Sequence, residues 1–261
     1  MSTYSPRTWR PAATALAAPL LLLVSSSAAP GLAAPQSAER DGTADHVVLE
    51  DFESSPLGGL PEGWDWRDSD DDKEKPYAVV EADGNRYLQA RDEGQSVILG
   101  KEIRWNLKEY PYLSFRVRVH EIPRGGDERD DEKVDSAAGI YVTYDKKAFG
   151  TIPVSVKFVW SSTLPVGAAT IRPGIGRPWQ VVFDSGEEGL GEWRIYVVDL
   201  REVYRSTFRR DPPDRPLGIG ILSDANSTSS RAWADYDDII AWRDPPPGIR
   251  REVLELLPPK R

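Results

Sequence analysis

The chain contains no cysteine, a single methionine and only two histidines in 261 residues. Without cysteine it can form no disulfide bond, and it cannot carry the lipid-modified cysteine that anchors bacterial lipoproteins. One histidine, His46, lies in a polar leader, which leaves His120 alone and argues against a histidine-based zinc site. The stability of the fold must therefore come from core packing rather than from disulfides or zinc.

Several catalytic signatures are also missing. No serine lies in a nucleophile elbow, and no glycine-rich phosphate-binding loop follows an expected strand. No strand carries the paired carboxylates of a retaining glycosidase. The loops SSTLPVG and SDANSTSS follow expected strands, where sites often lie, but turn chemistry also explains their composition. The sequence favours a non-catalytic protein and leaves an enzyme open.

One apolar run, Ala12 to Val24, stands near the start of the chain and is shorter than the ~20 residues that span a bilayer. Two arginines precede it and small residues follow it, an order typical of a secretory signal peptide. We therefore expect residues 1–33 to be removed after Ala29 or Ala33, and the mature protein to be periplasmic or secreted without a membrane span. An uncleaved anchoring helix is the alternative.

The charge of the chain is strongly negative, at −9 for the whole sequence at pH 7. Removal of Arg7 and Arg10 with the signal peptide would take it to −11. Such a charge argues against binding to nucleic acid or to an anionic membrane surface. The nine tryptophans are consistent with a large core and also with stacking on sugar rings.

Beyond the signal peptide we expect three segments, which are a flexible leader at 34–46, one domain at 47–243 and a proline-rich tail at 244–261. A domain of roughly this size can bury a core without cross-links. The charge runs DSDDDKEK and RGGDERDDEKVD inside it are expected to be solvated loops, with cation binding as the alternative. No role is assigned to the tail.

Within the domain, apolar and polar residues alternate with a period of two. The pattern is clearest at 113–120, LSFRVRVH, and recurs at 140–144, 154–160, 193–198 and 217–221. Such alternation predicts half-buried antiparallel strands. About ten to twelve strands at this spacing predict an all-β, antiparallel β-sandwich of the jelly-roll type.

One short helix is expected near 199–209. Asp199 and Glu202 form a capping-box pattern ahead of apolar residues at helical spacing, and RRDPPDRP ends the segment.

The expected strands carry basic and aromatic residues on their polar faces. These residues are Arg116, Arg118, His120, Tyr141, Lys157, Arg194 and Tyr196. If the strands share one sheet, the residues form one face that binds an acidic polysaccharide, because arginine holds carboxylates bidentately and tyrosine stacks on sugars. The alternative is an ordinary solvated face covered by arginine and lysine stems.

Near the end of the domain, three carboxylates interrupt the apolar strand WADYDDIIAW. Alternation places Asp235 and Asp237 on one face with Ile239, and Asp238 on the other. Half-buried carboxylates are costly unless they are neutralised. If the first and last strands pair, Glu53 approaches these three, and a structural Ca²⁺ bound by the four carboxylates would offset the cost. Ion pairs with arginine are the alternative.

The chain also resembles a known family. The stretches DFESSPLGGLPEGW, LGKEIRWNLKEYPYLSFRVRVHEIP, GLGEWRIYVVDLREVYRSTF and ILSDANSTSSRAWADYDDI carry the resemblance. Through them, residues 49–240 resemble the bacterial family known as domain of unknown function three-zero-four-seven. The resemblance implies a secreted or periplasmic β-sandwich and no defined activity.

A second resemblance is looser. Phe52-Glu53 and Asp237-Asp238-Ile239 are similar to the opening and closing segments of jelly-roll carbohydrate-binding modules of the galactose-binding-like type. This resemblance implies that the first and last strands pair and that a structural calcium lies beside them.

The sequence therefore predicts an exported, non-catalytic binding module for a polysaccharide, most consistent with an acidic one. A polysaccharide lyase is one alternative, in which His120 and Tyr141 would act as base and acid. A scaffold that binds another envelope component is the other. The oligomeric state is left open.

Overall fold

The computed structural model describes residues 45–66, 70–147 and 152–246. The expected signal peptide, nearly all of the leader and most of the tail lie outside these ranges. Within them, the one helix is too short to cross a membrane, and no segment qualifies as a membrane-spanning helix.

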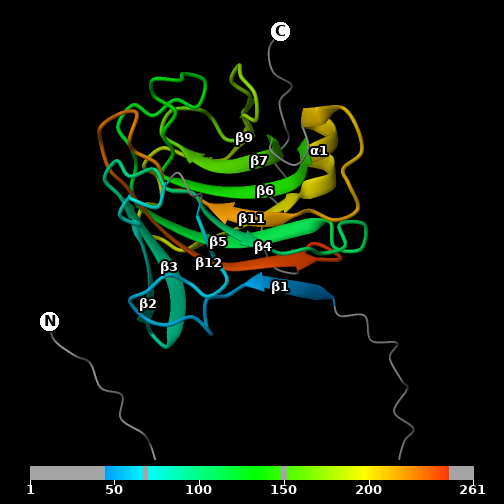
Figure 1. The fold of residues 1–261 in the computed structure, drawn as a ribbon, viewed down its shortest axis with the longest axis horizontal. Helices are drawn as coiled ribbons and strands as arrows, with labels where there is room; N and C mark the ends of the chain where they lie inside the picture. Colours follow the sequence, from blue (N-terminus) through cyan, green and yellow to red (C-terminus); the bar gives the residue numbers. More distant parts are fainter. Residues whose placement is uncertain (1–44, 67–69, 148–151, 247–261) are drawn as a thin grey trace, which may run out of the picture. The chain divides into compact units, whose positions relative to one another are not determined.

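Twelve strands in the described part of the chain form two six-stranded sheets, here called sheet A and sheet B (Figure 1). Sheet A has the order β10(Arg194–Asp199), β5(Tyr112–Glu121), β12(Ala232–Trp242), β3(Asn85–Asp92), β2(Tyr77–Ala82), and β1(His46–Glu50) also pairs with β12. Sheet B has the order β4(Leu99–Glu102), β11(Gly218–Ile221), β6(Ala138–Lys147), β7(Ile152–Ser161), β9(Trp179–Ser185), β8(Ala169–Thr170). All pairs are antiparallel except β7 with β9. The predicted β-sandwich is confirmed.

Strand β12 connects the two ends of the domain. Its first half pairs with β3 from Ala232 to Tyr236, and its second half pairs with β1 from Ile239 to Trp242. Both halves also pair with β5. The predicted pairing of the first and last strands is therefore confirmed.

The change of partner along β12 coincides with a β-bulge. Asp238 has a positive φ of 47°, and the register with β5 shifts between Asp237 and Ile240. The extra residue reverses the alternation, so Ile239 is buried in the core with Tyr236. The expectation that Ile239 shares a face with Asp235 and Asp237 is wrong, because strict alternation does not continue through a bulge.

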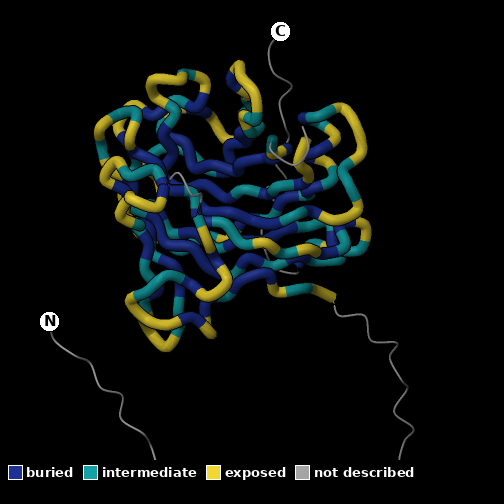
Figure 2. Tube along the Cα trace, viewed as in Figure 1, coloured by how far each residue is buried: buried dark blue, intermediate teal, exposed yellow. Residues whose placement is uncertain are grey.

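The core lies between the two sheets, where the strands are mostly buried, whereas many loop segments are exposed (Figure 2). Phe115 of β5 lies at its centre, with its ring centroid 5.1 Å from that of Phe183 on β9 and 6.3 Å from that of Phe158 on β7. The predicted inward faces of β5, β6 and β7 are all buried.

Strand β10 is the exception to the predicted pattern. The alternation predicts Ile195 in the core and Tyr196 on the polar face, whereas Ile195 is 48% exposed and Tyr196 is buried. The Tyr196 ring packs against Phe115 and Phe183, with centroids 5.7 and 4.6 Å away. Both faces of this strand contain apolar residues, so polarity alone does not indicate which face is buried.

The predicted helix is confirmed as α1(Leu200–Phe208). The side chain of Asp199 accepts hydrogen bonds from the backbone N–H groups of Arg201 and Glu202, as an N-cap does. Tyr204 attaches the helix to sheet B, with its ring centroid 4.6 Å from that of Tyr144.

Removal of the central aromatic ring should destabilise the domain. We expect Phe115→Ala to lower the free energy of unfolding by about 3–5 kcal/mol, because the ring is fully buried and leaves a cavity. Ile195→Ala on the adjacent strand is the control and should change it by no more than about 0.5 kcal/mol. Urea denaturation measures both, and similar losses in the two variants would contradict this packing.

Candidate functional site

The predicted basic face is divided between the two sheets. Arg116, Arg118 and His120 alternate with core residues of β5 and lie on the outer face of sheet A. Tyr141 on β6 and Lys157 on β7 lie on the outer face of sheet B. Because the sheets pack through their inner faces, these outer faces point in opposite directions. The expectation of one shared basic face is therefore wrong.

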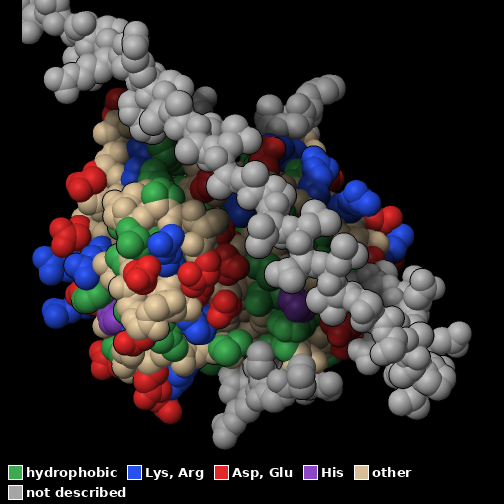
Figure 3. All heavy atoms as spheres, turned by 90° about the horizontal axis from the view of Figure 1, so that it is seen from below, with side chains coloured by type: hydrophobic (Ala, Val, Ile, Leu, Met, Phe, Trp, Pro, Cys, Tyr) green, Lys and Arg blue, Asp and Glu red, His purple; other side chains and the backbone are tan. Residues whose placement is uncertain are grey.

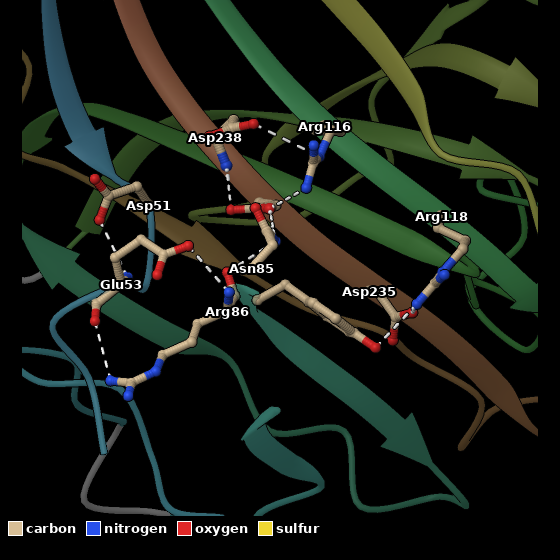
Figure 4. A network of polar contacts seen from close by, with 10 residues as sticks. Asp51, Glu53, Asn85, Arg86, Arg116, Arg118, Asp235 and Asp238 are labelled. Atoms are coloured by element: carbon tan, nitrogen blue, oxygen red, sulfur yellow. Dashed lines mark hydrogen bonds and ion pairs between the residues drawn. The ribbon is translucent and has the colours of Figure 1, made fainter. Parts of the chain in front are cut away.

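The cations on sheet A are paired with the carboxylates of β12 (Figure 4). Arg118 Nε donates to Asp235 Oδ2 at 2.8 Å, and His120 Nε2 lies 2.7 Å from the same oxygen. Arg116 forms an ion pair with Asp237 across the same ladder. Asp235 and Asp237 are 0% and 1% exposed, so these pairs offset the cost of buried charge.

An aromatic ring packs against both arginines of these pairs, and burial changes the pKa of one of the carboxylates. The guanidinium carbons of Arg116 and Arg118 lie 4.6 and 4.7 Å from the ring centroid of Trp193. Burial raises the pKa of Asp237 to about 6, and the charge of Asp238 contributes in the same direction. On the side of the molecule shown in Figure 3, basic and acidic side chains lie next to one another rather than in separate patches.

The four carboxylates of the calcium hypothesis already have other partners. Glu53 Oε1 accepts from the backbone N–H of Arg86 at 3.0 Å, and Asp238 Oδ2 lies 3.6 Å from Arg116 Nε. In the described ranges, no group of three or more His, Cys, Asp or Glu side chains is arranged to hold a metal ion. Calcium binding by these four carboxylates stays a prediction.

Arg194 and Tyr196 do not lie on an open ligand face. Arg194 Nη1 donates to Asp184 Oδ2 at 3.0 Å, and the Tyr196 hydroxyl bonds to the same carboxylate. Since Tyr196 is buried against the core, this pair connects β10 of sheet A to β9 of sheet B. The expectation that both residues stand on the polar face with the other cations is wrong.

The outer face of sheet B carries a groove of about 740 Å³, here called the Asp224 pocket. Strands β6, β7, β9 and β11 form its base, and segments around Arg172 and Asp224 form its walls. Of the residues predicted from the sequence, Tyr141 and Lys157 line it. A volume of this size is typical of ligand pockets.

Two side chains that line this pocket each bury one acceptor oxygen without a hydrogen-bond partner. Gln180 Nε2 donates to the backbone carbonyl of Glu128 at 3.1 Å, which fixes the amide and leaves Gln180 Oε1 unpaired. Asp224 is 7% exposed, and its Oδ1 is also unpaired. In the described ranges, the other buried side-chain atoms without partners are all N–H donors. A buried unpaired polar group costs ~1–3 kcal/mol, so a ligand that donates hydrogen bonds would be favoured here.

Lys157 supplies a buried cation to the same pocket. Its side chain crosses Gly139, where any Cβ would overlap Lys157 Cε, and its Nζ donates to Ser136 Oγ at 3.3 Å. Burial lowers the pKa of Lys157, whereas the nearby charges of Asp224 and Glu128 act in the opposite direction. Burial likewise raises the pKa of Asp224. The pocket therefore combines a cation with acceptors.

Sequence reasoning missed Gln180, Arg172 and Asp224. The only signal for Asp224 was its place in the polar loop SDANSTSS, where turn chemistry was an equally good explanation. The lyase hypothesis requires His120 and Tyr141 in one site, but they lie on the outer faces of different sheets. That pairing of base and acid is not formed.

The buried Asp224 carboxylate predicts a pH-dependent difference in stability. Because burial raises its pKa above the ordinary value of 3.8, the folded state holds this proton more tightly than the unfolded chain. The corresponding stability is lost as the pH rises through the raised pKa. As the pH rises from about 4 through the raised pKa, the unfolding free energy of Asp224→Asn should therefore increase relative to that of the unsubstituted protein. Denaturation at stepped pH measures this, and parallel curves would contradict it.

The calcium hypothesis predicts that calcium raises the melting temperature, because a ligand that binds only the folded state stabilises it by mass action. Thermal melting with calcium and with a chelator checks this, together with elemental analysis. The double variant Glu53→Gln/Asp238→Asn should lose the calcium response. Identical melting in both conditions with no bound metal would remove the site.

Comparison with known proteins gives one family and several distant structures. The family model described as "Protein of unknown function (DUF3047)" matches residues 62–240. No curated protein matches the chain. A structure on the promiscuous specificity of β-sandwich carbohydrate-binding modules is 14% identical, with a TM-score of 0.35, over 74% of this chain; the chain spans 60% of that structure's length.

Two further structures are similar at comparable levels. The family 11 carbohydrate-binding module of the cellulase Lic26A-Cel5E of Clostridium thermocellum is 10% identical, covering 77% of this chain and 96% of its own, with a TM-score of 0.36. A carbohydrate-binding module specific for non-crystalline cellulose, CBM28, is 15% identical, covering 75% of this chain and 94% of its own, with a TM-score of 0.38.

The family match spans more than half of the chain and confirms the resemblance seen in the sequence, so the chain belongs to the DUF3047 family.

Proposed function

We propose that this protein is an exported, non-catalytic carbohydrate-binding domain that binds a polysaccharide in the Asp224 pocket. The observation that carries the proposal is the pair of buried, unpaired acceptors, Gln180 Oε1 and Asp224 Oδ1. Sugars present many hydroxyl donors on a compact ring, so a bound sugar would satisfy these acceptors once the two side chains turn toward the groove.

The other side chains of the pocket support the same ligand class. Tyr141 provides an aromatic ring beside the acceptors, and such rings stack on the apolar faces of sugars. Lys157 provides a donor for ring oxygens, hydroxyls or carboxylates, as does Arg172 with the N–H groups that its ion pair with Asp131 leaves over. The basic N-terminal segment followed by an apolar run supports export to a compartment where polysaccharides are found.

The opposite face of the sandwich is less suited to binding. Its arginines are already paired with Asp235 and Asp237, and a ligand would have to break these buried pairs to bind there. Breaking a buried pair is expensive, at about 3–5 kcal/mol, because it leaves a charge uncompensated. We therefore place the binding site on sheet B.

A glycan panel with one variant on each face tests the proposal. We expect Tyr141→Ala to weaken polysaccharide binding by ~10-fold or more, as the loss of ~1.4 kcal/mol would. Trp193→Ala removes an aromatic residue from the sheet A face and should leave binding unchanged. Affinity electrophoresis and calorimetry measure both, after circular dichroism has confirmed folding.

The result has three clear readings. Loss of binding only in Tyr141→Ala supports the pocket. Loss only in Trp193→Ala moves the site to sheet A and overturns its assignment to sheet B. If no polysaccharide binds the unsubstituted protein, the carbohydrate-binding function itself is wrong.

A further inference from the structure

A second hollow of about 700 Å³, here called the Trp66 pocket, lies beside the Asp224 pocket. The two pockets share four lining residues, which are Ile98, Gly100, Thr143 and Ile219. Since the shared residues lie on or next to β4, β6 and β11, the pockets adjoin along the outer face of sheet B. The two pockets are therefore neighbours on this face.

Two paired glycines lie at the junction between the pockets. Gly100 of β4 pairs directly with Gly220 of β11, and both glycines line the Asp224 pocket. A Cβ built on Gly100 would meet only ordinary van der Waals contacts, the nearest being the backbone oxygen of Asp65 at 3.8 Å, whereas one built on Gly220 would lie 3.3 Å from the backbone oxygen of Leu99. An extended ligand would therefore meet no side chain from these two positions between the pockets.

The two pockets differ in the hydrogen-bonding groups that they offer. The Asp224 pocket has unpaired acceptors. The Trp66 pocket has the exposed cations Arg104 and Lys146, and neither forms an ion pair with any residue that the structure describes. A third cation, Lys101, bonds to Glu50 Oε2 at 2.8 Å.

Acidic residues of the Trp66 pocket do not cancel this excess. They are Asp65, whose Oδ1 accepts from the backbone N–H of Trp66 at 2.8 Å, and Glu102. Over both pockets, six basic side chains face four acidic ones in a chain of net charge −9. Arg104 and Lys146, which have no ion-pair partner among the described residues, therefore make the Trp66 pocket locally positive, and local charge governs an anionic ligand nearby.

We infer that the two pockets form one groove for a linear acidic polysaccharide, whose carboxylate or sulfate groups lie against Arg104 and Lys146 while its hydroxyls donate to Gln180 and Asp224. This inference rests on the proposed function and names its ligand class. Arginine and lysine both bind such anions, and arginine does so bidentately.

Affinity electrophoresis tests the anionic end of the groove. Gels contain polygalacturonate, alginate, the carboxylate-free sulfated polymer carrageenan or the neutral polymer hydroxyethyl cellulose. We expect the unsubstituted protein to bind at least one acidic polymer better than the neutral one, and Arg104→Ala/Lys146→Ala to bind it at least ~10-fold more weakly. Binding to the neutral polymer should be unchanged in the double variant.

The matched control is Lys108→Ala/Arg205→Ala, which removes the same charge from exposed ion pairs outside the groove. It should bind as the unsubstituted protein does. Equal losses in both double variants would show a general charge effect and overturn the inference. A preference for the neutral polymer would also overturn it while leaving the proposed function intact. Binding to none of the polymers would overturn both. The uronate and sulfate polymers distinguish carboxylate from sulfate.

A second pair of variants tests the span of the groove with uronate oligosaccharides of increasing length. We expect affinity to rise with length in the unsubstituted protein, and Gly100→Val to remove most of that gain because its side chain rises at the junction. Gly59→Val, at a position equally free of close contacts but outside the groove, should keep the gain. Length dependence unchanged by Gly100→Val would show that the ligand occupies one pocket only.

Discussion

The pairing of two buried carboxylates with two arginines across the β5–β12 ladder determines much of what this domain can do. Asp235 and Asp237 stand in a central strand of sheet A, where isolated charges would be very costly. Arg118 and Arg116 lie opposite them in register and neutralise them. Because these arginines are committed to the strand that joins the ends of the domain, we place the proposed ligand site on the other sheet.

The buried face of a strand is predictable from the sequence where one face is apolar and the other is polar. In β5 and β6 each inward residue is apolar and its neighbours are mostly polar, so the buried face was evident. In β10 the contrast is absent, and Tyr196 was placed on the wrong face. The bulge at Asp238 has no sequence signal of this kind, since a positive φ at aspartate depends on the partners of the strand. Period-two patterns also cannot show which strands share a sheet, and this is why the cations were grouped wrongly.

The candidate site was the least predictable part because its residues come together only in the folded sheet. Glu128 and Asp135 lie in a charge run that was expected to be a solvated loop, yet both are fully buried. They are close enough to the buried Lys157 to stabilise its charge, which explains why an acidic loop packs inward here. In turn the backbone carbonyl of Glu128 orients Gln180. The acidic run that resembles an ordinary solvated loop in the sequence thus helps to position the side chains of the pocket.

The two outer faces of the sandwich therefore differ in how completely their polar groups are satisfied. On sheet A the buried carboxylates have cationic partners, and the buried side-chain atoms of its described residues that lack a hydrogen-bond partner are N–H groups such as Trp233 Nε1. On sheet B the protein buries acceptors at Gln180 and Asp224 without a donor, although burying such groups unpaired lowers stability. Natural domains carry such costs mainly where a ligand recovers them. This asymmetry, rather than the total number of charged residues on either face, is the physical reason to assign recognition to the groove on sheet B.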